Sequence, residues 1–506
     1  MRSAAGLSAL AAALVWAGCS APPRVPAPAP LPEAFSASGE TQQPDRWWEA
    51  LGDPELSRLV DEALAGNLEL AAVWDRLVQA RAVARREGAR LLPALDLDST
   101  VGTTWSQQEG RASSASFGGT GLRRVDRFRL GLAFAWELDV FGRLRAARDS
   151  LRYEAQASEA DVRAAAILLA AQVASQWYSV VELERQLALL DSQIETNEDV
   201  ARLVTIRFRA GQVGAADVLR QRQLTEQRRG ERHRVEGEAR VARHALAVLL
   251  GRAPDALALE VPPTLPMPGE LPATGLPAAL LERRPDVQRA YLAVLAADRD
   301  LHVARMDRLP RLALTSSPQF TSEVLADLVD NWLIGLAANL TAPLLDAGRR
   351  RAEVQRVEGV VSERIHGYGQ VVLTSLREVE DALVLERQQR SVIGSLEAQL
   401  ELARGTLDRL RDRYIRGGAD YLDVLGALAS QQTLERDLLV SRRALLDVRI
   451  ALHRALAGGF ALDAPGAAGL AASGAASAIE SPGRVDAAAQ TRIATSRGWT
   501  AGEAAR

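Results

Sequence analysis

The chain contains one short stretch twice, and this repetition limits the folds it can adopt more than any other feature. The stretch that begins at Arg207 returns without gaps at Arg413, 206 positions later. Each copy is typical of the tip of a helical hairpin, where a left-handed glycine ends one helix and an aspartate lies in the first turn of the next. These residues are Gly211 and Asp217 in the first copy and Gly417 and Asp423 in the second.

The longest predicted helices lead into these tips. No proline interrupts residues 142–211 or 348–417, and apolar residues recur there at alternating steps of three and four, which is coiled-coil patterning. A helix of about 65 residues is about 100 Å long, so we expect two long helical hairpins rather than a globular core. The return helices are expected at about residues 216–250 and 422–456. The apolar seam includes Leu169, Val173, Trp177, Val180, Leu187, Leu190 and Ile194 in the first copy, and Ile393, Leu396, Leu400, Ala403, Leu407, Leu410 and Tyr414 in the second.

In the residues before each long helix, the spacing of the apolar residues changes from helical to alternating. Helical spacing over residues 54–92 and 278–309 ends at a proline in both copies. The residues that follow alternate between apolar and polar, which is the pattern of strands with two unlike faces. The apolar positions are Leu95, Leu97, Val101, Trp105, Phe128, Leu130, Leu132, Phe134, Trp136, Leu138 and Val140 in the first copy, and Leu312, Leu314, Phe320, Trp332, Ile334, Leu336, Ala338, Leu340 and Leu344 in the second.

These four strands favour a membrane, although one face of a soluble β-sandwich gives a similar pattern. The clearest alternation is as long as the roughly 9–11 residues that a tilted membrane strand needs, and aromatic residues lie near its ends. A closed membrane barrel needs at least about eight strands. Because one chain offers four, we expect several copies to share one barrel.

The N-terminus is predicted to export and anchor the chain. Residues 1–18 have the short apolar run and the small-residue end of a signal peptide. Cys19, the only cysteine, follows directly, and the stretch before it resembles a bacterial lipoprotein processing box in which Cys19 is lipidated. Trp16 departs from that box, which usually has Leu there, and an ordinary signal peptide with an incidental cysteine is the alternative. The Pro-rich residues 19–45 are expected to form an extended tether.

The composition argues against several function classes. The 61 basic residues nearly balance the 64 acidic ones, so a nucleic-acid surface is not expected. The five histidines are scattered without a chelating pair, which argues against a metal site. The sequence also lacks a P-loop, a dinucleotide-binding glycine motif and a cysteine placed to act as a nucleophile. We therefore expect neither an enzyme nor a cofactor.

Together these features resemble the outer-membrane efflux proteins, the TolC-like family, in its lipoprotein branch of the NodT type. The resemblance rests on the paired tips, the long helices, the four strands and the start Trp-Trp-Glu-Ala-Leu-Gly-Asp-Pro at residues 47–54. It implies a mainly α fold with transmembrane β, in which a homotrimer forms a twelve-stranded β-barrel in the outer membrane and an α-barrel of coiled-coil hairpins in the periplasm. It also implies a passive efflux conduit that docks on a periplasmic adaptor protein and an inner-membrane transporter.

The twofold repeat sets the expected domain boundaries. The first efflux repeat is expected over residues 46–262 and the second over residues 263–462. Residues 463–506, rich in Ala, Gly and Ser, are expected to be disordered. The lipid-anchored chain would span the outer membrane and extend into the periplasm. Drugs, metal ions and nodulation-type signals all remain open as cargo, because in this architecture the pump selects what is exported.

The resemblance assigns an acidic ring to the second tip. Asp423 matches a position where three symmetry copies narrow the periplasmic entrance, and such a ring favours cations. Asp420 is a candidate second acidic residue, because Gly426 stands where the family often has one. The alternative is that Asp423 only stabilises the start of its helix.

The resemblance also assigns a gate and a docking surface to the tips. Tyr414 and Asp217 match positions whose hydrogen bond ties neighbouring hairpins shut, and Arg207 and Arg413 are the nearby charge partners. For Asp217 a capping role alone is an equal alternative. The expected adaptor contacts are Gly211, Gln212, Gly417 and Gly418.

Two rival functions remain. A periplasmic lipoprotein scaffold would share the lipid anchor and the coiled-coil pattern, but it would not need strands long enough to cross a membrane. A secreted enzyme has little support, since no catalytic motif is present.

Overall fold

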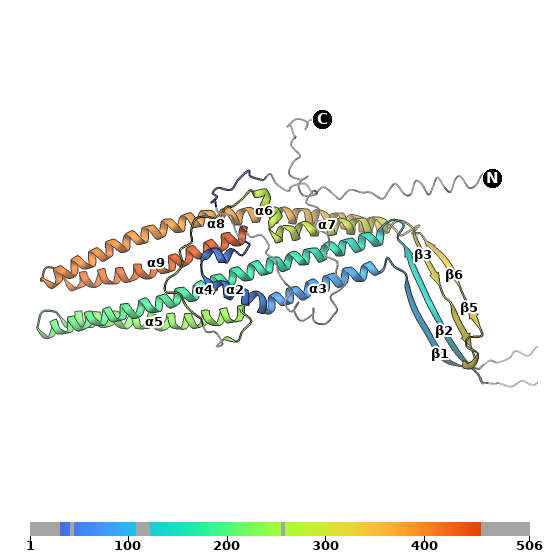
Figure 1. Cartoon of the computed structure of the whole chain (residues 1–506), viewed down its shortest axis with the longest axis horizontal. Helices are drawn as coiled ribbons and strands as arrows, with labels where there is room; N and C mark the ends of the chain where they lie inside the picture. The colour runs from blue at the N-terminus through green and yellow to red at the C-terminus, as the bar shows by residue number, and fades with distance from the viewer. Residues whose placement is uncertain (1–30, 41–44, 108–121, 255–258, 457–506) are drawn as a thin grey trace, which may run out of the picture. The chain divides into compact units, whose positions relative to one another are not determined.

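The computed structural model describes residues 31–40, 45–107, 122–254 and 259–456, and Figure 1 shows their order along the chain. These residues form two compact units. The strand unit combines residues 76–159 with 289–369 and contains every described strand. The tip unit combines the remaining described residues and contains both hairpin tips.

The first helical segment of each copy is broken, where we predicted a continuous helix. In the first copy α2 spans Pro54–Gly66 and α3 spans Leu68–Ala89. Asn67 lies between them with extended backbone, and its Oδ1 accepts a hydrogen bond from Leu70 N at 2.9 Å. Its Nδ2 donates to Leu249 O, also at 2.9 Å. A side chain that caps the following helix competes with continuation of the preceding one, so Asn67 accounts for the break.

The second copy breaks at an equivalent place for a different reason. α6 spans Pro277–Arg283 and α7 spans Pro285–Met306. The residue before a proline is pushed out of the helical region, and Arg284 accordingly has a ψ of 122°. Its buried guanidinium donates to Asp286 Oδ2 at 2.7 Å and to Glu378 Oε2 at 2.8 Å. These bonds hold the α6–α7 corner against the helix that carries Glu378.

The two long hairpins confirm the coiled-coil prediction within a few residues. The helices are α4 (Arg143–Arg209), α5 (Ala215–Leu249), α8 (Arg349–Ile415) and α9 (Tyr421–Leu456). α4 and α8 each contain 67 residues. Gly211 has a φ of 72° and Gly417 a φ of 77°, the left-handed conformation that glycine adopts without a steric cost. Asp217 and Asp423 lie in the first turns of α5 and α9, as predicted.

The main core of the tip unit is assembled on α4. The short 3-10 helix η1 (Trp47–Leu51) buries both of its tryptophans in this core. Trp177 of α4 donates its indole N–H to Asp53 Oδ2 at 2.8 Å, and the same carboxylate caps the start of α2. Among the described helices, only α4 is long and apolar enough to cross a membrane. Because 61% of its apolar window is buried inside the protein, that window serves as core.

The strand unit contains one antiparallel sheet whose second-copy strands are interrupted. Its strands are β1 (Ala94–Gln107), β2 (Leu122–Leu138), β3 (Arg311–Ser316), β4 (Gln319–Ser322), β5 (Trp332–Leu333) and β6 (Leu336–Thr341). β2 pairs with β1 on one side and with β3 and then β4 on the other. β6 pairs with β3, and β5 pairs with β4. The breaks face each other, since Ser317 N donates to Gly335 O at 3.0 Å and Leu132 N to Pro318 O at 2.9 Å.

Four continuous strands were predicted, and two of them are therefore wrong in detail. Pro318 interrupts the first strand of the second copy because it has no N–H for the ladder. Gly335 lies opposite, and the second strand divides there into β5 and β6. Val140 and Leu344 lie beyond the strand ends.

One face of this sheet is apolar across all its strands. Directly opposed residues of antiparallel strands share a face, and the register opposes Leu97 to Leu132 and Leu336 to Ser316. Leu97 and Leu336 are 70% and 79% exposed. The apolar face consists of Leu95, Leu97, Val101, Phe128, Leu130, Leu132, Phe134, Trp136, Leu138, Leu312, Leu314, Phe320, Trp332, Leu336 and Leu340. An apolar face of this extent needs an apolar covering.

Candidate functional site at the hairpin tips

A small apolar cluster joins the tip of hairpin α4–α5 to the tip of hairpin α8–α9. Its buried members are Val204, Val218, Tyr414, Tyr421 and Val424. The rings of Tyr414 and Tyr421 lie 5.9 Å apart at an interplanar angle of 54°, within the range of favourable aromatic contacts. Separating the two tips would expose these side chains to water, so the cluster favours the packed arrangement of the two tips.

The two equivalent arginines of the repeat make different contacts. Arg207 reaches from one hairpin to the other, with its guanidinium carbon 4.4 Å from the centre of the Tyr414 ring. It also lies within 3.4 Å of the carbonyl oxygens of Tyr414 and Ile415, to which it donates long hydrogen bonds. Arg413 instead turns back on its own tip and donates to Gly418 O at 3.0 Å. Only the first-copy arginine therefore links the hairpins.

The expected hydrogen bond between Tyr414 and Asp217 is not formed within this chain. Among the described residues, Tyr414 Oη has no hydrogen-bond partner, and Asp217 Oδ2 accepts from Gly214 N at 3.3 Å. The hydroxyl that links the hairpins belongs to Tyr421, which donates to Gln221 Oε1. Burial, and then the neighbouring Tyr414 and Asp217, raise the pKa of Tyr421, so this phenol remains a hydrogen-bond donor at neutral pH. A Tyr414–Asp217 contact between chains stays a prediction.

The two acidic candidates of the second tip are exposed. Asp423 lies in the first turn of α9, and Asp420 directly precedes that helix. Neither carboxylate has an ion-pair partner in the described part of the chain. Both can therefore present negative charge at the tip, as the acidic ring requires.

The turns also expose apolar side chains that the sequence pattern did not single out. Gly211, Gln212, Gly417 and Gly418, the predicted docking residues, are all exposed. Five large apolar residues surround them with 43–64% of their surface exposed, namely Ile206, Phe208, Leu219, Ile415 and Leu422. They lie off the coiled-coil seam, and this position on the helix was the available signal. Such a surface is suited to contact with another protein.

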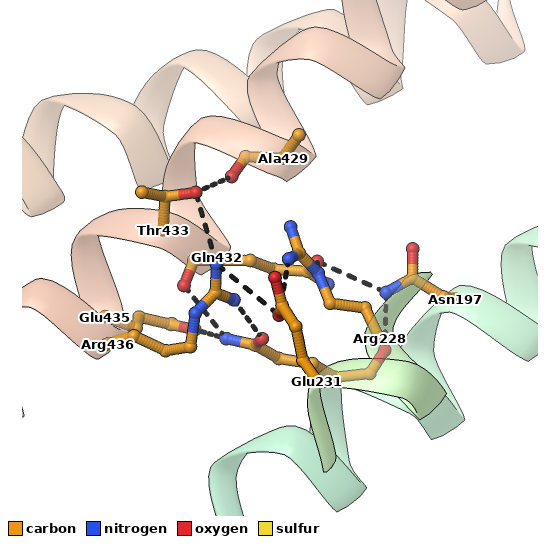
Figure 2. Close-up of polar contacts among 9 residues, drawn as sticks. Asn197, Arg228, Glu231, Ala429, Gln432, Thr433, Glu435 and Arg436 are labelled. Carbon is orange, nitrogen blue, oxygen red and sulfur yellow. Dashed lines mark hydrogen bonds and ion pairs between the residues drawn. The ribbon is translucent and has the colours of Figure 1, made fainter. Parts of the chain in front are cut away.

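Behind the tip cluster lies a buried group of polar side chains that sequence reasoning also missed. We call it the polar layer, and it consists of Gln193, Asn197, Gln221, Arg228 and Gln432, each at most 4% exposed. Figure 2 shows part of it, where α9 meets α4 and α5. The signal was present in the spacing, because Asn197 lies seven residues from both Leu190 and Val204, which are buried apolar residues of the same seam.

This structure does not test the remaining predictions from the sequence. Cys19, the predicted lipidation site, and the predicted signal peptide and C-terminal tail lie outside the described residues. Within the described residues, no group of three or more His, Cys, Asp or Glu side chains could hold a metal ion.

Comparison with known protein families gives a clear match. The family described as outer membrane efflux protein matches residues 59–252 and 276–458. The pyoverdine export outer membrane protein OpmQ of Pseudomonas aeruginosa is 31% identical over 478 residues, which cover 91% of this chain and 98% of the relative. The cation efflux system protein CusC of Escherichia coli is 28% identical over 467 residues, which cover 88% of this chain and 98% of the relative.

Solved structures agree with these sequence matches. The outer-membrane channel OprN superposes with a TM-score of 0.79 at 26% identity, covering 87% of this chain and 99% of the channel. CusC superposes with a TM-score of 0.77 at 27% identity, covering 87% of this chain and 100% of CusC.

Proposed function

The chain belongs to the outer membrane efflux protein family and is an outer membrane efflux channel, and we propose that it acts as a gated trimer within a tripartite pump. In this proposal the strands cross the outer membrane and the hairpin tips form the periplasmic gate. The chain conducts substrate passively and catalyses no reaction. The relatives carry names as different as pyoverdine export and cation efflux, so we assign the choice of cargo to the partner transporter.

The observation that carries this proposal is the exposed apolar face of the sheet. Leu97 and Leu336 project from that face into the surroundings, while the opposite face of β1 presents Asp96 and Asp98. A strand that is apolar outside and polar inside is what a transmembrane barrel requires. A periplasmic scaffold gives no reason for such a face.

The edges of the sheet support a shared barrel. Within the described chain, β1 pairs only with β2, and β6 pairs only with β3. Unpaired strand edges cannot lie in lipid, because their backbone groups would have no hydrogen-bond partners. Three chains that pair edge to edge would give twelve strands from four strand positions each, which closes the barrel.

We further propose that a periplasmic adaptor docks on the tips. The exposed apolar residues around Gly211 and Gly417 support a protein contact there. The lipid anchor at Cys19 and the repeat boundaries at residues 46–262 and 263–462 belong to the same proposal. The anchor would hold the N-terminus at the inner leaflet of the outer membrane.

Crosslinking in cells tests the partners. A cysteine placed at Gln212 or Gly418 should capture an adaptor protein, and through it an inner-membrane transporter, because both residues are exposed at the turns. A cysteine at exposed Gln227, on the side of α5, is the matched control and should capture less. Capture of peptidoglycan-associated proteins alone would favour the scaffold instead.

Replacing Asp423 with Ala should weaken the preference of the isolated channel for cations. Three exposed carboxylates around a narrow entrance raise the local cation concentration, and their removal takes away that field. The measurement is the reversal potential across a salt gradient in a planar bilayer. The same substitution at Asp437, exposed on α9 away from the tip, is the control. An unchanged reversal potential in the Asp423 variant would mean that the selective ring lies elsewhere.

A further inference from the structure

The polar layer interrupts the apolar seam of the tip unit. On α5, Val218 and Val235 are buried and apolar, and each of the three buried residues between them is polar. These are Gln221, Thr225 and Arg228. On α9 only Gln432 is buried between Leu428 and Leu438. The two hairpins therefore meet through hydrogen bonds, not through apolar packing, between the tip cluster and the main core.

One side-chain oxygen of α9 connects this layer to the other hairpin. Gln432 Oε1 accepts a hydrogen bond from Asn197 Nδ2 and another from Arg228 Nε, both at 3.2 Å (Figure 2). The backbone oxygen of Gln432 accepts from Gln193 Nε2 at 3.1 Å. Gln221 Nε2 donates to the backbone oxygen of Asn197 at 2.8 Å and extends the network toward the tip. Gln432 thus bonds both α4 and α5 from α9, beside Glu435 and Arg436 of the same helix, which also contact Gln193.

Positively charged arginine side chains lie near Gln432, so a hydrogen-bond acceptor at this position is stabilising. The Arg228 side chain, only 4% exposed, pairs with Glu231 at 2.8 Å. Arg436 donates to Gln193 Oε1 at 2.8 Å and lies 3.9 Å from Glu231. Burial and then the nearby Arg228 lower the pKa of Arg436, because removal from water and a neighbouring positive charge both disfavour the charged guanidinium. An oxygen contributed by α9 stabilises this arrangement only while the hairpins are aligned.

A polar interface of this kind responds to separation differently from an apolar one. When the hairpins part, water replaces the lost hydrogen bonds, so opening costs little beyond the bonds themselves. When one partner is removed from the closed state, the remaining donors are buried without acceptors, which destabilises that state. The hydrogen bonds of the polar layer are therefore satisfied in only one alignment of the two hairpins, as buried polar residues fix one register in coiled coils.

We infer that Gln432 is a positioning residue of the gate, which holds hairpin α8–α9 in its closed alignment on hairpin α4–α5. The polar layer is then a second tie behind the tip cluster, and opening must break both. This inference rests on the proposed gate function.

Two substitutions at Gln432 test the inference. Both side chains are similar to glutamine in size, but they are expected to change the channel current differently. Gln432→Met keeps the volume but removes the acceptor, so in the closed state Arg228 Nε and one N–H of the Asn197 amide lose their partner, while the amide keeps its bond to Gln193 O. The ratio of open to closed channel should rise about tenfold, which corresponds to about 1.4 kcal/mol. Gln432→Glu keeps an oxygen for both donors and adds a charge that Arg228 stabilises, so its current should stay at or below that of the parent. The readout is the current of the full-length trimer in planar bilayers.

Packing alone predicts the reverse order. If Gln432 only fills space, Met should be tolerated and a buried carboxylate should loosen the hairpins. Higher current in Gln432→Glu than in Gln432→Met would therefore overturn the inference, as would equal currents in all forms. Gln227→Met, at an exposed site beside Arg228, is the matched control and should leave the current unchanged. If Gln432→Met does not assemble, Asn197→Leu removes a donor to the same oxygen and carries the test.

A second set of measurements distinguishes failure of this inference from failure of the proposed gate. Spin labels at Gln212 and Gly418 should move apart in Gln432→Met, because release of the layer frees one hairpin from the other. Arg207→Met, which removes the link at the tip itself, should raise the current independently. If only Arg207→Met raises the current, the gate stands and the role of Gln432 is lost. If neither substitution changes the current, both proposals fail.

Discussion

Replacing Arg449 with Met should lower the free energy of unfolding by about 3–5 kcal/mol, the loss expected when one partner of a buried ion pair is removed. The side chains of Arg449 and Glu386 are only 4% and 2% exposed. Arg449 Nε donates to Glu386 Oε2 at 2.9 Å, and its other nitrogens donate to the carbonyl oxygens of Gly269 and Glu270. Without Arg449, the Glu386 carboxylate stays buried with only the longer bonds from half-exposed Arg390, at 3.2 and 3.3 Å, and the link between the two repeats keeps only the Arg390 bonds to Pro268 O and Gly269 O.

Denaturant unfolding followed by the helical signal would measure this loss, and protease cleavage near Gly269 would report release of the link. Arg442→Met is the control on the same helix, since Arg442 pairs with Glu397 at a half-exposed site and should cost about 0–1 kcal/mol. The double variant Arg449→Met with Glu386→Met should recover much of the stability, because a buried pair can be replaced by apolar side chains of similar volume. Equal unfolding of Arg449→Met and Arg442→Met would contradict a dominant role for this pair.

Leu97→Arg should prevent stable insertion into the outer membrane. Leu97 opposes Leu132 on the apolar face and is 70% exposed, so in the proposed barrel it contacts lipid. A positive charge on the lipid face of a membrane barrel costs up to roughly 2–4 kcal/mol, depending on its depth in the bilayer, and the proposed trimer carries three copies. Membrane fractionation and the heat-modifiable migration of the trimer on a gel would report the loss.

Asp98→Arg is the matched control for this substitution. It places the same side chain one residue later, and successive residues of a strand point to opposite faces. Asp98 opposes Gly131 on the polar face, which in the proposed barrel faces the aqueous interior. Insertion should be retained. If both variants insert equally well, the apolar face does not contact lipid and the scaffold interpretation gains.

Long-range periodicity explains why so much of the fold could be predicted from the sequence. A seam that repeats over 67 residues leaves few alternatives, so α4 and α8 lie within two residues of their expected ends. Local interruptions were harder, because Asn67 has a side chain that caps a helix only in the right backbone context. Pro318 was visible in the sequence, but its consequence depends on which strand pairs with it.

The residues of the candidate site show the same difference between local features and long-range contacts. Gly211 and Gly417 could be predicted because their conformation is a local property of the turn. The partner of each polar side chain could not, since Tyr421 and Gln221 meet only after two hairpins pack together. Gln432 was missed for the same reason, because its side-chain bonds join α9 to residues that lie 235 and 204 positions earlier in the sequence.

The divergence of Arg207 and Arg413 has a consequence for symmetry. The internal repeat would give three assembled chains six nearly equivalent tips, yet one arginine of each pair spans two hairpins and the other closes on its own turn. In the proposed trimer, the apparent sixfold arrangement would therefore be only threefold, with two kinds of tip in alternation. A partner present in six copies must recognise two different surfaces with one sequence, whereas a partner present in three copies can select one kind of tip.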